Sequence, residues 1–137
     1  MKVKALALSA ALGGLLLPLL AGHANAHHSF AMFDPDKTIT KVGTVKELEW
    51  TNPHVWLHVM ALDDAGKVVE YAFEMQAVAQ ATSGGWRPDI VKPGDKISVN
   101  YHPLRDGSRG GELLTATLAD GRSLQAQAAR LPVPKAP

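Results

Sequence analysis

The alternation of apolar and polar residues along the chain predicts a series of short β-strands. The strongest alternation covers residues 54–62, where one face carries Val55, Leu57, Val59 and Ala61. A period of two with one apolar face is typical of a strand that covers a core on one side. Further strands are predicted from weaker alternation at 42–50, 68–75, 96–101 and 113–118, with a short pairing segment at 122–124.

One segment breaks the alternation. Residues 76–83 are rich in alanine and glutamine, which favour a short helix, and Gly84-Gly85 ends it. In the first strand, Val42, Thr44, Lys46, Leu48 and Trp50 share one face, and Gly43 indicates a bulge or a sharp bend. Three strands, a short helix and two or more further strands predict an all-β fold, a small OB-like Greek-key β-barrel. A small open β-sandwich is the alternative.

The first 26 residues have the pattern of a cleavable signal peptide. Lys2 and Lys4 precede an apolar run from Ala5 to Leu20, and Ala24-Asn25-Ala26 is a small-x-small cleavage site. A membrane anchor is the other interpretation, but the uninterrupted apolar stretch is short for a bilayer, and two glycines and a proline interrupt the run. No later segment is apolar enough to span a membrane.

Cleavage after Ala26 leaves 111 of the 137 residues. They divide into an extended N-terminal arm (27–40), an OB-like β-barrel domain (41–125) and a flexible, proline-containing tail (126–137). The signal peptide holds two of the 14 basic residues and none of the 13 acidic ones, so 12 basic and 13 acidic residues remain, a net charge of −1. This balance, without any basic cluster, argues against nucleic acid as a partner.

Histidines carry the most specific chemical signal. Cleavage after Ala26 would place His27 at the new N-terminus, where its α-amine and imidazole can chelate one metal ion together. A nitrogen-rich set of this kind suits Cu(II), and His28 offers a second binding mode. The simpler interpretation is that two polar residues follow a cleavage site. The chain has no cysteine, so thiolate metal sites and disulfides are excluded.

Two later histidines are candidate additional metal ligands. His54 begins the best strand and His102 ends the fourth, so a barrel could bring either of them to the N-terminal arm. His58 lies about 13 Å along the strand from His54 and cannot share an ion with it. Hydrogen-bonding roles at the surface are the alternative for all three.

Tryptophans and glutamates give a second set of candidates. Trp50, Asn52, Trp56 and Trp86 could line a cleft for a small molecule or protein partner, together with the glycine-rich segment 106–111. Alternatively, the tryptophans anchor the core, with their indole N–H groups bonded to the backbone. The strand glutamates, among them Glu70 and Glu74, either face solvent or include one buried carboxylate. Such a carboxylate could pair with Arg87, Arg105 or Arg109, or could orient a ligand histidine.

Catalytic motifs are missing from the sequence. The serines lack a G-x-S-x-G context, no zinc-protease helix motif occurs, and residues 106–111 lack the ending of a phosphate-binding loop. The sequence therefore favours a non-enzymatic binding protein. A copper-dependent oxidative enzyme remains a third, weaker hypothesis.

Several motifs together resemble a known family. They are His27-His28-Ser29-Phe30, the segment 49–56 (EWTNPHVW), Gly85-Trp86, the segment 92–95 (KPGD), the segment 106–111 (DGSRGG) and the segment 118–122 (LADGR). The chain resembles a family of small exported bacterial proteins that is catalogued only as a domain of unknown function. The resemblance implies export to the periplasm and one β-rich domain, and it supplies no activity.

The leading hypothesis is therefore a periplasmic protein that binds Cu(II), or another late transition metal, through His27 and His28, with His54 or His102 assisting. The alternative is a metal-free β-barrel that binds a small molecule or a protein partner.

The cleavage site is directly testable. We expect the exported protein to begin at His27, because Ala24 and Ala26 occupy the small-residue positions of the site. Intact mass and N-terminal sequencing of the exported protein check this. A start one residue earlier or later would remove the terminal His27 on which the copper hypothesis depends.

Overall fold

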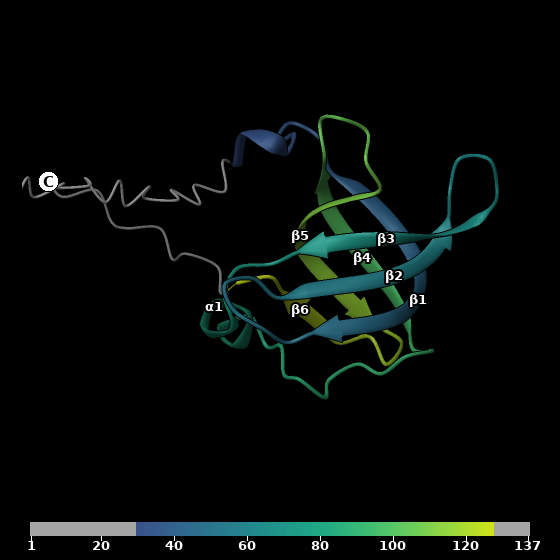
Figure 1. The fold of residues 1–137 in the computed structure, drawn as a ribbon. Helices are drawn as coiled ribbons and strands as arrows, with labels where there is room; N and C mark the ends of the chain where they lie inside the picture. The colour runs from purple at the N-terminus through teal and green to yellow at the C-terminus, as the bar shows by residue number, and fades with distance from the viewer. Residues whose placement is uncertain (1–29, 128–137) are drawn as a thin grey trace, which may run out of the picture.

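The computed structural model describes residues 30–127, whose strands wrap around a common interior (Figure 1). The predicted signal peptide, His27, His28 and residues 128–137 of the predicted tail lie outside the described residues. The elements are η1 (Phe30–Met32), β1 (Ile39–Glu49), β2 (Trp56–Leu62), β3 (Val68–Glu74), α1 (Val78–Ser83), β4 (Lys96–Pro103), β5 (Gly110–Leu118) and β6 (Ser123–Gln125).

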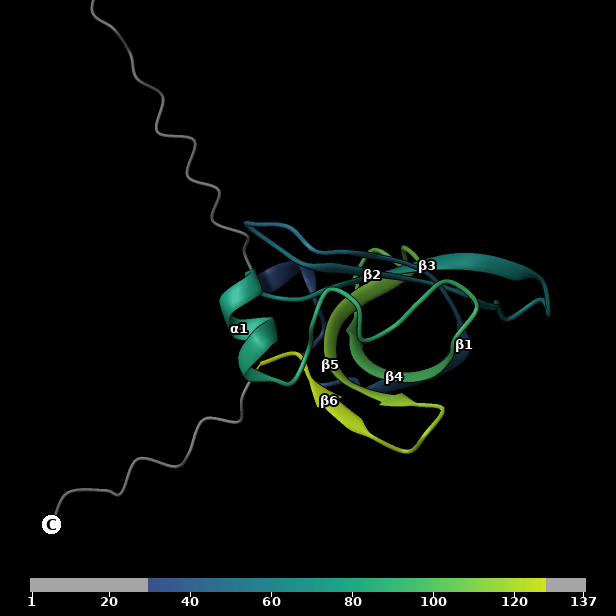
Figure 2. The same cartoon turned by 90° about the horizontal axis from the view of Figure 1, so that it is seen from below.

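The strands close into a barrel. The order in the sheet is β3-β2-β1-β4-β5-β6, and β3 also pairs with β5, which joins the two ends of the five-stranded set. All neighbours are antiparallel except β3 and β5, which are parallel. Figure 2 shows the ring of strands from below, with α1 beside it. The prediction of a small OB-like barrel with one short helix is confirmed, and the open sandwich is excluded.

The barrel interior is built from the apolar faces that the alternation predicts. The four residues of the predicted apolar face of β2 are all buried. Phe73 of β3 and Leu113 of β5 face them, and Trp86, after α1, is fully buried in the same core. The helix is shorter than expected, beginning at Val78 rather than at residue 76.

The prediction that Val42 and Thr44 share a face of β1 with Leu48 and Trp50 is wrong. Val42 is 67% exposed, whereas Val45 is 2% exposed and belongs to the core. A register shift between Val45 and Glu47 inserts an extra residue opposite β2. Such a bulge reverses the alternation, so odd-numbered residues point inward before it and even-numbered ones after it. Odd-numbered residues of β1 before the bulge and even-numbered residues after it therefore both face the core.

The last strand of the ring begins earlier than predicted, at Gly110 rather than residue 113. Gly110 pairs with Ala72 of β3, and Gly111 pairs with both Phe73 of β3 and Pro103 of β4. A Cβ atom on Gly110 would lie 1.9 Å from the Ala72 carbonyl oxygen, and one on Gly111 would lie 1.9 Å from the His102 carbonyl oxygen. The two glycines therefore let β5 fit between its neighbours and close the ring.

Replacing Gly111 tests the importance of this close approach. We expect Gly111→Ala to lower the free energy of unfolding by about 3 kcal/mol or more, because the clash is with backbone and the strands must separate to relieve it. Chemical denaturation measures the change. Gly107→Ala is the matched control: its φ is +80° but nothing lies within 4 Å, so it should cost only about 1 kcal/mol. Equal losses in both variants would contradict the interpretation.

Candidate functional site

Barrel closure brings two histidines and two carboxylates into one row. The pairing of β3 with β5 sets Glu74 opposite Glu112, and the pairing of β4 with β5 sets His102 opposite Glu112. At the other end of the row, the His54 Nδ1 atom lies 3.1 Å from the Glu74 Oε1 atom. We call these four residues, His54, Glu74, Glu112 and His102, the rim row. Their chain neighbours Phe73, Leu113 and Tyr101 point into the core, so the row faces outward.

Glu74 differs from the other strand glutamates. It is only 7% exposed, although it lies on the outward face of β3. The solvent-facing alternative is therefore wrong for this residue, whereas Glu70 and Glu49 remain accessible. The contact with His54 matches the other alternative, in which a buried carboxylate orients a histidine.

His54 is held by the turn that precedes β2. Its Nδ1 atom also lies 3.0 Å from the Met75 carbonyl oxygen, and Val55 and Met75 exchange backbone hydrogen bonds that continue the pairing of β2 with β3. Asn52 fixes the same turn: its Oδ1 atom accepts a hydrogen bond from the Val78 N–H at the start of α1. The Asn52 side chain, a predicted ligand contact, thus caps the helix, which has no side-chain cap of its own.

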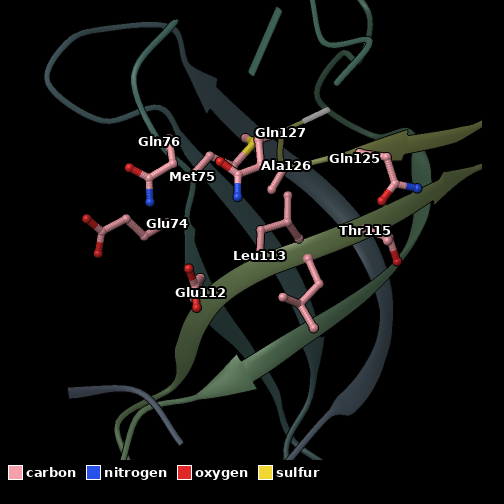
Figure 3. Close-up of a pocket in the computed structure, with 10 residues that line it drawn as sticks. Glu74, Met75, Gln76, Glu112, Leu113, Thr115, Gln125, Ala126 and Gln127 are labelled. Atoms are coloured by element: carbon pink, nitrogen blue, oxygen red, sulfur yellow. The ribbon is translucent and has the colours of Figure 1, made fainter. Parts of the chain in front are cut away.

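A cleft of about 240 Å³ adjoins the two carboxylates. In Figure 3, Glu74 and Glu112 lie on one side of the group of lining residues, with Gln76 above Glu74. Gln127 and Leu113 also line the cleft. Burial raises the pKa of Glu112, and the nearby Glu74 carboxylate raises it further, while His102 acts in the opposite direction. The ionised form of Glu112 is therefore disfavoured in the absence of a neighbouring cation.

The N-terminal arm is fastened beside His102. Phe33 is buried and forms a bridge with Leu104. The Arg105 backbone N–H donates to the Met32 carbonyl, and its Nε–H donates to the Ala31 carbonyl at 3.1 Å. Closer to β1, the His102 Nδ1 atom lies 2.8 Å from the Lys37 carbonyl oxygen. The described part of the arm therefore follows the end of β4 and the residues just after it.

His58 belongs to a separate surface network. Its Nδ1 atom lies 2.7 Å from Glu70 Oε1, and its Nε2 atom lies 3.1 Å from Glu49 Oε1. Lys46 pairs with the same Glu70, and the hydrogen bonds from Lys46 and His58 lower the pKa of that carboxyl. This arrangement stabilises neighbouring strands through side-chain pairs and leaves His58 apart from the rim row.

The tryptophans serve mainly the core. Trp86 is 0% exposed, and Trp50 packs against the same cluster while partly buried; Trp56 is also half-buried. The expectation that indole N–H groups bond to the backbone is wrong for Trp86, whose Nε1 atom is buried without a hydrogen-bond partner among residues 30–127. A fully buried Trp86 offers no surface to a ligand, so the predicted set of Trp50, Asn52, Trp56 and Trp86 does not form one cleft.

Within residues 30–127, no group of three or more histidines and carboxylates is arranged to hold a metal ion. His54 and His102 lie at opposite ends of the rim row. Any metal bound here by three or more ligands would therefore need donors from beyond the described residues. The same range contains no helix long and apolar enough to cross a membrane.

Comparison with protein-family models identifies the family of the chain. A model of a family of unknown function, DUF6152, matches residues 16–113. The chain belongs to this family. The match includes every residue of the rim row and confirms the resemblance to a family of unknown function. No curated protein and no solved structure matches the chain. Membership gives no activity, so function has to be argued from the residues.

The raised pKa of Glu112 predicts a pH-dependent stability difference. A carboxyl whose pKa is raised by folding stabilises the fold while protonated, and loses that contribution as pH rises through the folded-state value. We expect Glu112→Gln to be more stable, relative to the unchanged protein, at pH 7 than at pH 4. Urea denaturation of the metal-free proteins across this range measures the difference.

Glu47→Gln is the matched control, because Glu47 is an exposed strand glutamate away from the rim row. Its stability, measured at the same pH values, gives the effect of removing an exposed strand carboxylate. A Glu112→Gln difference that moves in the opposite direction with pH would show that Glu112 is stabilised in its ionised form.

Proposed function

We propose that this protein is a non-enzymatic, periplasmic metal-binding protein that holds Cu(II) where its N-terminal arm meets the rim row. The observation that supports this most directly is the attachment of the arm beside His102. His27 and His28 would contribute the N-terminal amine and imidazoles, and the barrel would contribute one or two further ligands.

The length of the chain makes the proposal geometrically feasible. His28 precedes Phe30 by two residues, so their Cα atoms are at most about 7 Å apart. Phe30 is followed at once by Ala31 and Met32, whose carbonyls are bound by Arg105, three residues beyond His102. The metal-binding terminus is thus tethered close to the end of β4, rather than at the end of a long linker.

The hydrogen bonding of the rim histidines suits metal binding. A ligating histidine commonly donates one ring N–H to a carbonyl or carboxylate, which fixes the tautomer and leaves the other nitrogen as the ligand. His102 can donate Nδ1–H to the Lys37 carbonyl, which makes Nε2 its basic nitrogen. The His54 Nδ1 atom lies 3.0 Å from the Met75 carbonyl oxygen and 3.1 Å from Glu74 Oε1.

The two carboxylates complement a cation. Glu74 and Glu112 stand opposite each other on neighbouring strands. Burial and the Glu74 carboxylate both raise the pKa of Glu112. A divalent ion near the row would relieve their repulsion. The nitrogen-rich arm gives preference to Cu(II) over harder ions, which bind chiefly through oxygen.

Titration of the mature protein with Cu(II), followed by EPR, tests the proposal. We expect one high-affinity site with a nitrogen-rich spectrum, and at least about tenfold weaker binding when three extra residues precede His27, since neither histidine then stands among the first three residues. His102→Ala and His54→Ala distinguish which barrel histidine assists, through changes in the nitrogen hyperfine pattern.

His58→Ala is the matched control, because His58 is paired with Glu70 and lies outside the rim row. It should leave Cu(II) affinity and the EPR spectrum unchanged. Equal affinity with and without the three extra N-terminal residues would rule out the terminal amine as a ligand. Binding that survives that extension together with loss of both rim histidines would overturn the proposal.

A further inference from the structure

A second cleft, separate from the rim row, opens where the β2–β3 hairpin faces the loop before β5. It has a volume of about 480 Å³, within the range of small-molecule sites. Its polar lining consists of Lys41, Asp63, Asp64, Tyr71, Tyr101, Ser108 and Arg109. We call it the tyrosine cleft, and we propose that it binds a small organic carboxylate.

Two inward-pointing tyrosines form the polar floor of this cleft. Tyr71 is 7% exposed and Tyr101 is 4% exposed, and both belong to the barrel core. Their rings contact Phe73, with centroid separations of 6.3 Å for Tyr71 and 4.7 Å for Tyr101, so packing fixes both side chains. Within the described part of the chain neither hydroxyl has a hydrogen-bond partner, yet neither is sealed from solvent. Two held phenol groups thus offer hydrogen bonds to whatever enters.

A lysine joins the tyrosines from β1. Lys41 lies before the bulge, on the same inward-facing alternation as Val45. Its ammonium lies 4.7 Å from the centre of the Tyr71 ring and donates to the Leu62 carbonyl at 3.2 Å. An ammonium has three donors, so this hydrogen bond leaves others for a ligand. The groups that face into the cleft from the strands are therefore one cation and two hydroxyls, a set that favours an anion.

The carboxylates of the cleft lie on its wall. Asp63 accepts hydrogen bonds from the backbone of Ala65 and Lys67, and its other oxygen lies 3.8 Å from Arg109 Nη2. These contacts engage Asp63 in the hairpin turn. Asp64 is exposed, but its carboxylate acts on Tyr101: burial, the Tyr71 hydroxyl and Asp64 together raise the pKa of Tyr101. Each negative charge on a ligand is therefore opposed by Asp64. The cleft should therefore prefer a ligand with a single carboxylate.

The remaining lining residues favour a ligand that carries an apolar group beside its carboxylate. Ile39, Pro103 and Leu104 line the same cleft beside the tyrosines. A carboxylate placed between the tyrosine hydroxyls and Lys41 would have its hydrocarbon part against this wall. None of these residues belongs to the rim row, so the inference stands independently of copper binding.

Benzoate is a suitable probe, with benzamide and benzylamine as neutral and cationic counterparts of nearly the same shape. In a ¹H–¹⁵N NMR titration of the metal-free mature protein, we expect benzoate to bind in the millimolar range and shift the amides of residues 63–65 and 108–110. Benzamide should bind more weakly, and benzylamine should give no saturable shifts at these positions.

Variants expected to change benzoate affinity in opposite directions make the test specific. Tyr71→Phe and Tyr101→Phe keep the packed rings and should each weaken benzoate binding about three- to tenfold. Lys41→Gln should weaken it about tenfold, whereas Asp64→Asn should tighten it about two- to fivefold. Lys92→Gln, an exposed lysine outside the cleft, is the matched control and should change nothing.

Three results would overturn the inference. The first is the lack of saturable benzoate shifts in the cleft of the folded protein. The second is benzylamine binding as tight as that of benzoate, or weaker benzoate binding in Asp64→Asn, since either would mean that the wall carboxylates recognise a positive charge. The third is unchanged benzoate affinity in both tyrosine variants and in Lys41→Gln.

Discussion

The parallel pairing of β3 with β5 is the contact on which the rest of the structure depends. It joins the ends of an otherwise antiparallel sheet and so encloses the core. The contact requires β5 to approach two strands at once, and Gly110 and Gly111 permit this because neither has a side chain. Without closure, Phe73 and Leu113 would lie at open edges, and the apolar faces of the strands would have no common interior.

The same closure creates the chemistry of the outer surface. His54, Glu74, His102 and Glu112 come from four separate segments, and they form a row only because β5 bridges β3 and β4. The arm adds to this arrangement by binding along the residues after β4. The closure that encloses the core therefore also determines which ionisable groups meet on the outer surface.

Inward and outward faces give the barrel two chemically distinct places. The outward-facing rim row combines imidazoles with carboxylates, which suits a cation. The tyrosine cleft combines an inward-pointing lysine with two phenol hydroxyls, which suits an anion. The bulge in β1 contributes to this division, because it places Lys41 on the inward-facing alternation while Leu48, beyond it, still packs against the core. The two places share no side chain, so a ligand at one need not exclude a ligand at the other.

The sequence alone determined the fold class and most of the core. Period-two alternation in β2, turn residues between strands and a short alanine-rich helix were local signals, and each is set by neighbours in the chain. The histidines were recognisable as candidate ligands for the same reason. Only the tertiary structure decided the inward face of β1, the early start of β5, the burial of Glu74 and the partners of His54 and His102. These depend on a bulge and on contacts between strands far apart in sequence, and no local pattern encodes which distant backbone a residue will meet.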